Sequence, residues 1–166
     1  QYSRGLAFIR NRSKSDFENA IIHFNEAIKI EQNYPEAIAM LAETYFLKVS
    51  YDYMDFKDAI EIARPLVMKA LQLNPQLGTT HAVKGLMHWQ LANQGMRDET
   101  YPKEINQELD VAIEHFIKAI EINPSLAEPY MWYGSILQNK GDFADGFKLH
   151  KKAYEIDPRA PVVGFN

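Results

Sequence analysis

Apolar residues recur every three or four positions along much of the chain, and one such stretch occurs twice. Residues 20–30 read AIIHFNEAIKI and residues 112–122 read AIEHFIKAIEI, identical at seven of eleven positions. This spacing places two alanines and a phenylalanine of each stretch on one face of a helix. Degraded copies of the same stripe lie at Ala63, Val67 and Ala70 and at Gly146, His150 and Ala153. The pattern predicts a repeated helix with a closely packing face.

A second helical segment precedes each of these stripes, so the pattern predicts four helix pairs. The first helices are expected at about 2–11, 35–48, 79–91 and 127–139, and the second helices at about 15–30, 55–73, 102–122 and 143–156. Ser15 with Glu18 fits a capping box, Pro65 is expected to kink or break its helix, and Gly141 marks a turn. Nothing alternates with the period of a strand, so the predicted fold class is all-α.

Small and large residues at fixed offsets, followed by a proline, identify the repeat. The matching residues are Ala20, Phe24 and Ala27, then Leu41, Ala42, Tyr45, Ala63, Ala70 and Pro75, then Gly85, Ala112, Phe116, Ala119 and Pro124, and finally Gly134, Ala153 and Pro158. They resemble the tetratricopeptide repeat (TPR), a helical hairpin of about 34 residues. The resemblance implies a right-handed superhelical α-solenoid of about four hairpins in one domain, 1–166, with repeats 1–34, 35–77, 78–126 and 127–160.

Repeats two and three are longer than the others, and the extra residues fall between their two helices, at about 49–57 and 92–106. They are interpreted either as lengthened helices with tolerated loops or as an edge platform for a partner. Residues 161–166 read as the start of a truncated fifth repeat, without a polar cap. We therefore expect further repeats in a longer parent chain and an apolar terminal face that could form a homodimer.

The resemblance also implies a binding surface, because the first helices of this family line a concave groove that binds peptides or protein segments. An apolar, aromatic stripe of this kind is typical of an interaction surface. Burial of Trp89 and Trp132 against neighbouring helices is the alternative. The predicted groove residues are Met40, Glu43, Phe46, Leu86, Trp89, Met131, Trp132, Ser135 and Gln138, and a wider set adds Tyr2, Leu6, Ile9 and Val83.

One known use of such a groove is excluded by the residues present. TPR domains that grip the C-terminal carboxylate of chaperones carry an asparagine and several basic residues on the first helices. The matching positions here are Leu6, Met40, Val83 and Trp132. A carboxylate buried there without donors would be strongly unfavourable.

Composition narrows the class of protein further. The chain has 166 residues, 46% of them hydrophobic, and a net charge of −4, which argues against direct nucleic-acid binding by this fragment. It has no cysteine and no run of about 20 apolar residues that could span a membrane. The compartment is unknown; the cytoplasm is favoured, and the periplasm stays possible if a longer parent carries a membrane span.

Candidate chemistry is sparse. His81 and His88 share a helical face, but two histidines without a carboxylate at helical spacing do not indicate a metal site. His23 and His115 recur at equivalent positions of the repeated stripe and are interpreted as structural. There is no Gly-rich loop, nucleophile elbow or cysteine nucleophile. We therefore expect no catalytic residue, metal or cofactor, and a binding protein in place of an enzyme.

A narrower resemblance concerns repeat regions that follow a winged-helix or cyclase domain in bacterial regulators. It implies the regulatory half of a bacterial transcriptional regulator, in which another part contacts DNA. A scaffold in envelope or secretion assembly and a small-ligand sensor are the alternatives. The residues that carry the resemblance are Arg4-Gly5, Asn11-Arg12, Asp16, Ala20-Ile21, Phe24, Tyr34, Ala37, Leu41-Ala42, Tyr45, Asn74-Pro75, His81-Ala82, Trp132-Tyr133-Gly134, Asp157-Pro158 and Pro161-Val162-Val163.

Overall fold

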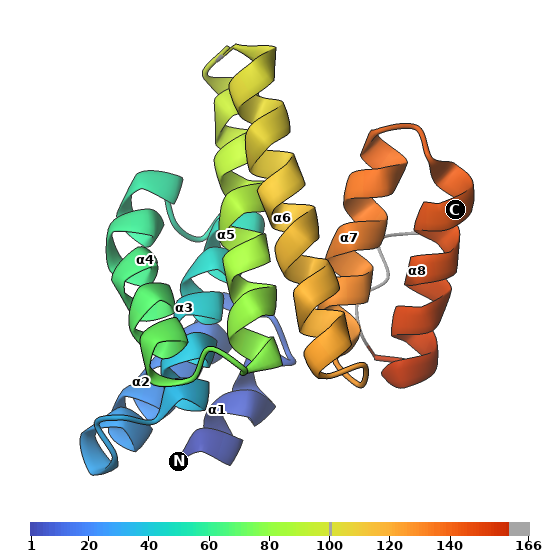
Figure 1. The fold of residues 1–166 in the computed structure, drawn as a ribbon. Coiled ribbons are helices and arrows are strands. Elements are labelled where there is room, and N and C mark those ends of the chain that lie inside the picture. The colour runs from blue at the N-terminus through green and yellow to red at the C-terminus, as the bar shows by residue number, and fades with distance from the viewer. Residues whose placement is uncertain (100, 160–166) are drawn as a thin grey trace. The chain divides into compact units, whose positions relative to one another are not determined.

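The computed structural model describes residues 1–99 and 101–159, and within them it contains eight α-helices and no strand (Figure 1). The prediction of an all-α fold is confirmed. The helices are α1 (Tyr2–Ile9), α2 (Lys14–Ile30), α3 (Pro35–Ser50), α4 (Phe56–Leu73), α5 (Gly78–Arg97), α6 (Pro102–Ile122), α7 (Ala127–Asn139) and α8 (Phe143–Ile156).

The chain forms two compact units, Gln1–Val83 and a second that begins at Lys84, within α5. In the first unit α1 packs on α2, α2 on α3, and α3 on α4. Ile38 and Ala39 of α3 form a buried cluster with Ala70 of α4, and Ile28 of α2 packs against it. The helix α3 is therefore covered on two flanks, by its own hairpin partner and by the hairpin before it.

Close approach of two helices depends on a glycine that faces a large buried ring. A methyl group at Gly5 of α1 would lie 2.5 Å from Cε1 of Phe24 in α2. In the second unit, a methyl at Gly85 of α5 would lie 2.5 Å from Cε1 of Phe116 in α6. Both phenylalanines are fully buried, so each ring occupies the space that a side chain would need on the facing helix.

The other two hairpins keep the register but change the residues. Gly134 of α7 faces His150 of α8, and a methyl there would lie 2.8 Å from Cδ2 of the histidine. In the α3–α4 hairpin, Ala42 and Val67 stand at the equivalent positions and are fully buried. In the α3–α4 hairpin, a residue larger than glycine on the first helix is thus accompanied by a residue smaller than phenylalanine on the second.

In the second unit α6 packs on α7 and α7 on α8. Trp132 of α7 contacts Phe116 of α6, with ring centroids 5.8 Å apart. Gly141, between α7 and α8, has φ +89°, a conformation that glycine adopts without the steric cost of a Cβ. The turn predicted at this glycine is therefore present.

A lysine–carboxylate pair joins successive hairpins once in each unit. Lys48 Nζ at the end of α3 lies 2.6 Å from Glu18 Oε1 of α2. Lys140 Nζ, which follows α7, lies 3.5 Å from Asp110 Oδ1 of α6. The two pairs are related by the same shift along the sequence that relates residues 20–30 to 112–122, so this contact belongs to the repeat.

Three local expectations are corrected. Ser13, not Ser15, caps α2, because its Oγ accepts a hydrogen bond of 3.1 Å from the backbone N–H of Asp16. Pro65 does not break α4, which continues through it to Leu73. The helix α5 extends six residues past Leu91, to Arg97, so much of the third-repeat insertion consists of lengthened helix. The predicted start of a fifth repeat at 161–166 lies outside the described residues.

The second-repeat insertion contains a short loop that packs on the first hairpin. Tyr51 and Tyr53 lie 5.7 and 6.1 Å from the ring of Phe17 in α2. The guanidinium of Arg12 lies 5.9 Å from the centroid of the Tyr51 ring. Phe17 is fully buried, which shows that this insertion contributes to the packing of the first unit.

Candidate functional site

The predicted groove residues of the first unit lie on α3 and are buried. Met40 is 8% exposed, Glu43 6% and Phe46 0%. The expectation of an exposed apolar stripe is wrong for this helix, because α2 and α4 cover both of its flanks.

The predicted residues of the second unit divide into a buried and a part-exposed group. Leu86, Met131 and Trp132 are buried, and Trp132 is held against Phe116. The expectation that these three form an open surface is wrong. Met131 and Trp132 belong to α7, which lies between α6 and α8, and Leu86 of α5 is 1% exposed.

Trp89 on α5 and Ser135 and Gln138 on α7 keep part of their surface exposed. Ser135 Oγ donates a hydrogen bond of 3.1 Å to the carbonyl oxygen of Met131 one turn earlier. The role of all nine residues in binding a partner stays a prediction, and the structure shows that these three are the more accessible ones.

The histidines make contacts that sequence spacing does not predict. His88 Nδ1 of α5 lies 2.6 Å from Glu108 Oε2 of α6, and the His88 ring stacks on His115 at 6.2 Å between centroids. His81 Nε2 lies 3.0 Å from the carbonyl oxygen of Pro75. Among residues 1–99 and 101–159 there is no cluster of three or more metal-ligating side chains. The contacts of His88 instead link the two helices of its hairpin.

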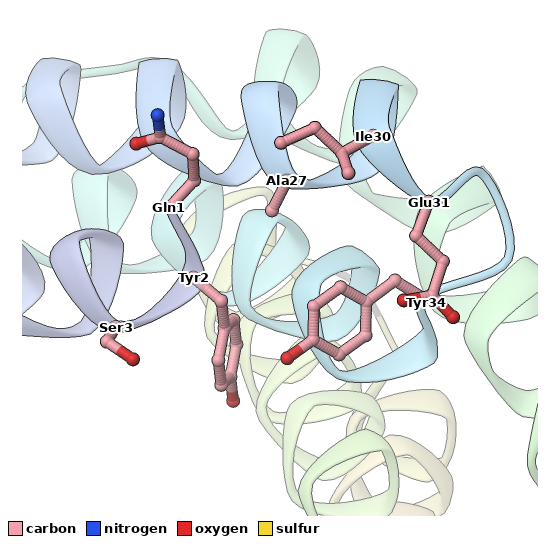
Figure 2. A pocket seen from close by; sticks show the side chains of 7 residues that line it. All are labelled: Gln1, Tyr2, Ser3, Ala27, Ile30, Glu31 and Tyr34. Carbon is pink, nitrogen blue, oxygen red and sulfur yellow. The ribbon is translucent and has the colours of Figure 1, made fainter.

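A pocket of about 280 Å³ lies in the first unit, beside the start of α1 and the end of α2 (Figure 2). Tyr2 and Tyr34 meet there with ring centroids 5.2 Å apart and ring planes inclined by 48°. Of the lining residues only Tyr2 belongs to the wider predicted groove set. The complete lining is Gln1, Tyr2, Ser3, Ala27, Ile30, Glu31 and Tyr34.

The two phenols of this pocket sit in a negative environment. Burial, reinforced by the neighbouring Tyr34, Glu36 and Glu43, raises the pKa of Tyr2 to about 12. Burial also raises the pKa of Tyr34, with Glu36 and Glu31 adding to the effect. Both phenols therefore stay neutral at physiological pH.

Comparison with solved structures identifies the fold. TTC0263, a thermophilic TPR protein of Thermus thermophilus, is similar over 94% of this chain and 74% of its own, with 16% identity and a TM-score of 0.69. The chain has the TPR fold. The sequence itself matches no protein-family model and has no significant match among curated proteins.

Two other solved structures are similar over most of this chain. MamA from Desulfovibrio magneticus RS-1 is 17% identical, with a TM-score of 0.51 over 96% of this chain and 75% of its own. A monomeric IFIT1 mutant solved with m7Gppp-AAAA is 15% identical, with a TM-score of 0.51 over 90% of this chain and 48% of its own. One fold serves many functions, so the choice of partner must be argued from the residues of this chain.

None of the helices described here is both long and apolar enough to cross a bilayer.

Proposed function

We propose that this TPR-fold chain is an interaction module that binds a peptide or a segment of another protein. Trp89 on α5 carries the proposal, because it is the one large aromatic of the predicted groove set that stays part exposed. Phe46 and Trp132, the other two, are buried. A part-exposed tryptophan combines a large apolar face with a hydrogen-bond donor, the combination favoured at interfaces.

The test starts from peptides selected on the purified chain from a displayed library. Trp89→Ala should weaken the binding of a selected peptide by about 2 kcal/mol, roughly 30-fold, with unchanged helicity by circular dichroism. The matched control is Met68→Ala, which truncates an apolar side chain that is 53% exposed on α4. Equal affinity of Trp89→Ala and Met68→Ala for the peptide would refute the assignment.

Trp132 has a different role in the proposal. Because it is 4% exposed and contacts Phe116, Trp132→Ala should lower stability and binding together. A variant that lost affinity at full stability would instead place Trp132 in the binding surface, as the sequence alone predicts.

We also propose that the chain is the regulatory part of a larger bacterial regulator. Its support is the resemblance of segments such as residues 74–82 to the repeat regions of such regulators. The coding sequence upstream of this chain tests the proposal. A winged-helix or cyclase domain there would support the proposal, and a signal or membrane segment would favour the scaffold. The small-ligand sensor is the remaining alternative.

Self-association through the last hairpin is a separate proposal. Phe143 and Tyr154 of α8 are 67% and 54% exposed. The equivalent residues of α2 are Phe17, which is fully buried, and Ile28, which packs against the α3–α4 cluster. If α8 offers the same surface to a second copy, sedimentation should show a concentration-dependent dimer that Tyr154→Glu abolishes, and a monomer at all concentrations would refute it.

A further inference from the structure

The pocket beside Tyr2 and Tyr34 has an apolar wall and an aromatic end. Ala27 and Ile30 of α2 supply the wall, and Ile30 is 80% exposed, so its side chain is open to anything that enters. The two tyrosine rings lie below them, with the Tyr34 hydroxyl directed toward Tyr2 (Figure 2).

Carboxylates supply the electrostatic character of the same place. Glu31 lines the pocket, and Glu36 and Glu43 lie close enough to raise the pKa of Tyr2. The Gln1 side chain points away from the two rings (Figure 2), and its Oε1 lies 2.9 Å from Nδ1 of His23. A cation is the kind of group that such a combination of ring faces and carboxylates attracts.

The proposed peptide partner narrows the choice of cation to a basic side chain. The pocket, at about 280 Å³, has room for one such side chain. Lysine and arginine carry their charge at the end of an apolar stem that packs along hydrophobic surface. The stem would lie on Ala27 and Ile30, and the charged end would reach the ring faces and Glu31.

We propose that this pocket binds a basic side chain, lysine or arginine, of the partner peptide. The assignment rests on the proposed peptide-binding function and adds to it the charge of one partner residue. It gives α1 and the α2–α3 turn a role in recognition that Trp89, on α5, does not provide.

The experiment titrates the ¹⁵N-labelled chain with n-butylguanidinium chloride and, in parallel, with n-butylurea, which has nearly the same shape and no charge. The guanidinium should give saturable shifts of the backbone amide signals of Ala27, Ile30, Glu31 and Tyr34, and the urea should not. A further arm with n-butylammonium distinguishes a preference for lysine from one for arginine. Equal shifts with the urea, or no saturable shift with either cation, would overturn the proposal.

Variants measure separately what the carboxylate and the aromatic rings contribute to guanidinium binding. Glu31→Gln should weaken guanidinium binding roughly threefold, because it removes one exposed charge and keeps the shape. Tyr34→Leu should weaken it by about as much, whereas Tyr34→Phe, which keeps the ring, should not. Glu61→Gln, at an exposed carboxylate of α4, is the matched control. Unchanged binding in both Glu31→Gln and Tyr34→Leu would overturn the assignment to this pocket.

The small probes also keep this proposal distinct from the general one. Trp89→Ala should leave the guanidinium titration unchanged while it weakens a selected peptide. If the guanidinium gives no amide shifts at the pocket but a library peptide still binds, only the basic-residue assignment is refuted. If the guanidinium shifts the pocket amides but no library peptide binds the chain, the proposed peptide-binding function is refuted.

Discussion

Substitution of Gly85 tests whether the sizes of the two facing residues are matched within each hairpin. In Gly85→Ala the new methyl would lie 2.5 Å from Cε1 of Phe116 and 3.0 Å from the carbonyl oxygen of Ala112. Phe116 is fully buried and is flanked by Trp132, so its ring has little room to move. The helices must therefore separate or the ring must leave its rotamer.

The magnitude follows from opposing effects. Overpacking a core costs about 1–3 kcal/mol, and alanine gains about 0.5–1 kcal/mol over glycine within a helix. We therefore expect Gly85→Ala to lower the free energy of unfolding by about 1–2 kcal/mol. Phe116→Val alone should lower it by about 2 kcal/mol, because it leaves a cavity.

The double variant tests whether the two changes in side-chain size compensate each other. Gly85→Ala with Phe116→Val places in the third hairpin the residues that the second hairpin has at Ala42 and Val67. Its loss of stability should be smaller than the sum of the single losses by about 1 kcal/mol or more. Urea denaturation followed by tryptophan fluorescence measures this directly, because Trp89 and Trp132 both lie in the unit that carries the changes. Additivity within about 0.5 kcal/mol would refute the volume exchange.

Three further variants test single contacts. Ser13→Ala should cost about 1 kcal/mol of unfolding free energy in urea, because the backbone N–H of Asp16 loses its cap. Thr80→Val should raise that free energy by about 1 kcal/mol, since the buried Thr80 hydroxyl has no partner among the described residues. Burial lowers the pKa of His150 from its ordinary 6.5, so the unfolded chain takes up a proton first and stability should fall as the pH drops below about 6.5. Urea midpoints at about pH 7.5 and about pH 5.5 should show a smaller pH-dependent loss in His150→Phe than in the unmodified chain.

Much of the fold follows from the sequence because its strongest signals are local. Helical spacing fixes the stripe of Ala112, Phe116 and Ala119, and the helix that carries it begins at Pro102 as predicted. Proline at the first helical position and glycine at a turn act within a few residues of chain, so Pro35 and Gly141 are also informative.

Local signals fail where two of them compete. Ser13 and Ser15 both precede or open α2, and only the observed backbone direction decides that Ser13 reaches the N–H of Asp16. Pro65 removes one hydrogen bond of α4, yet Ala63 and Val67 on either side of it are fully buried. The packing of this stripe outweighs the local cost of the proline.

The candidate site was less predictable, because exposure depends on neighbours that are distant in sequence. The register places Met40 and Phe46 on the expected helix, but their burial results from packing on both flanks of α3. Likewise, the carboxylate beside His88 is Glu108, on the facing helix. A search along one helix could not find it.

The recurrent lysine–carboxylate pair has a consequence for how the chain assembles. Lys48 meets Glu18 on α2, and Lys140 meets Asp110 on α6. Because each acid lies two residues before the repeated stretch of its helix, residues 20–30 of α2 and 112–122 of α6, each lysine would find an equivalent partner on the wrong helix, in its own chain or in another molecule. This contact therefore does not distinguish the correct neighbouring hairpin from an incorrect one. Hairpins of the same chain meet more often because the chain that links them keeps their effective concentration high. We therefore expect refolding at high protein concentration to favour exchange of hairpins between molecules, and dilution to suppress it.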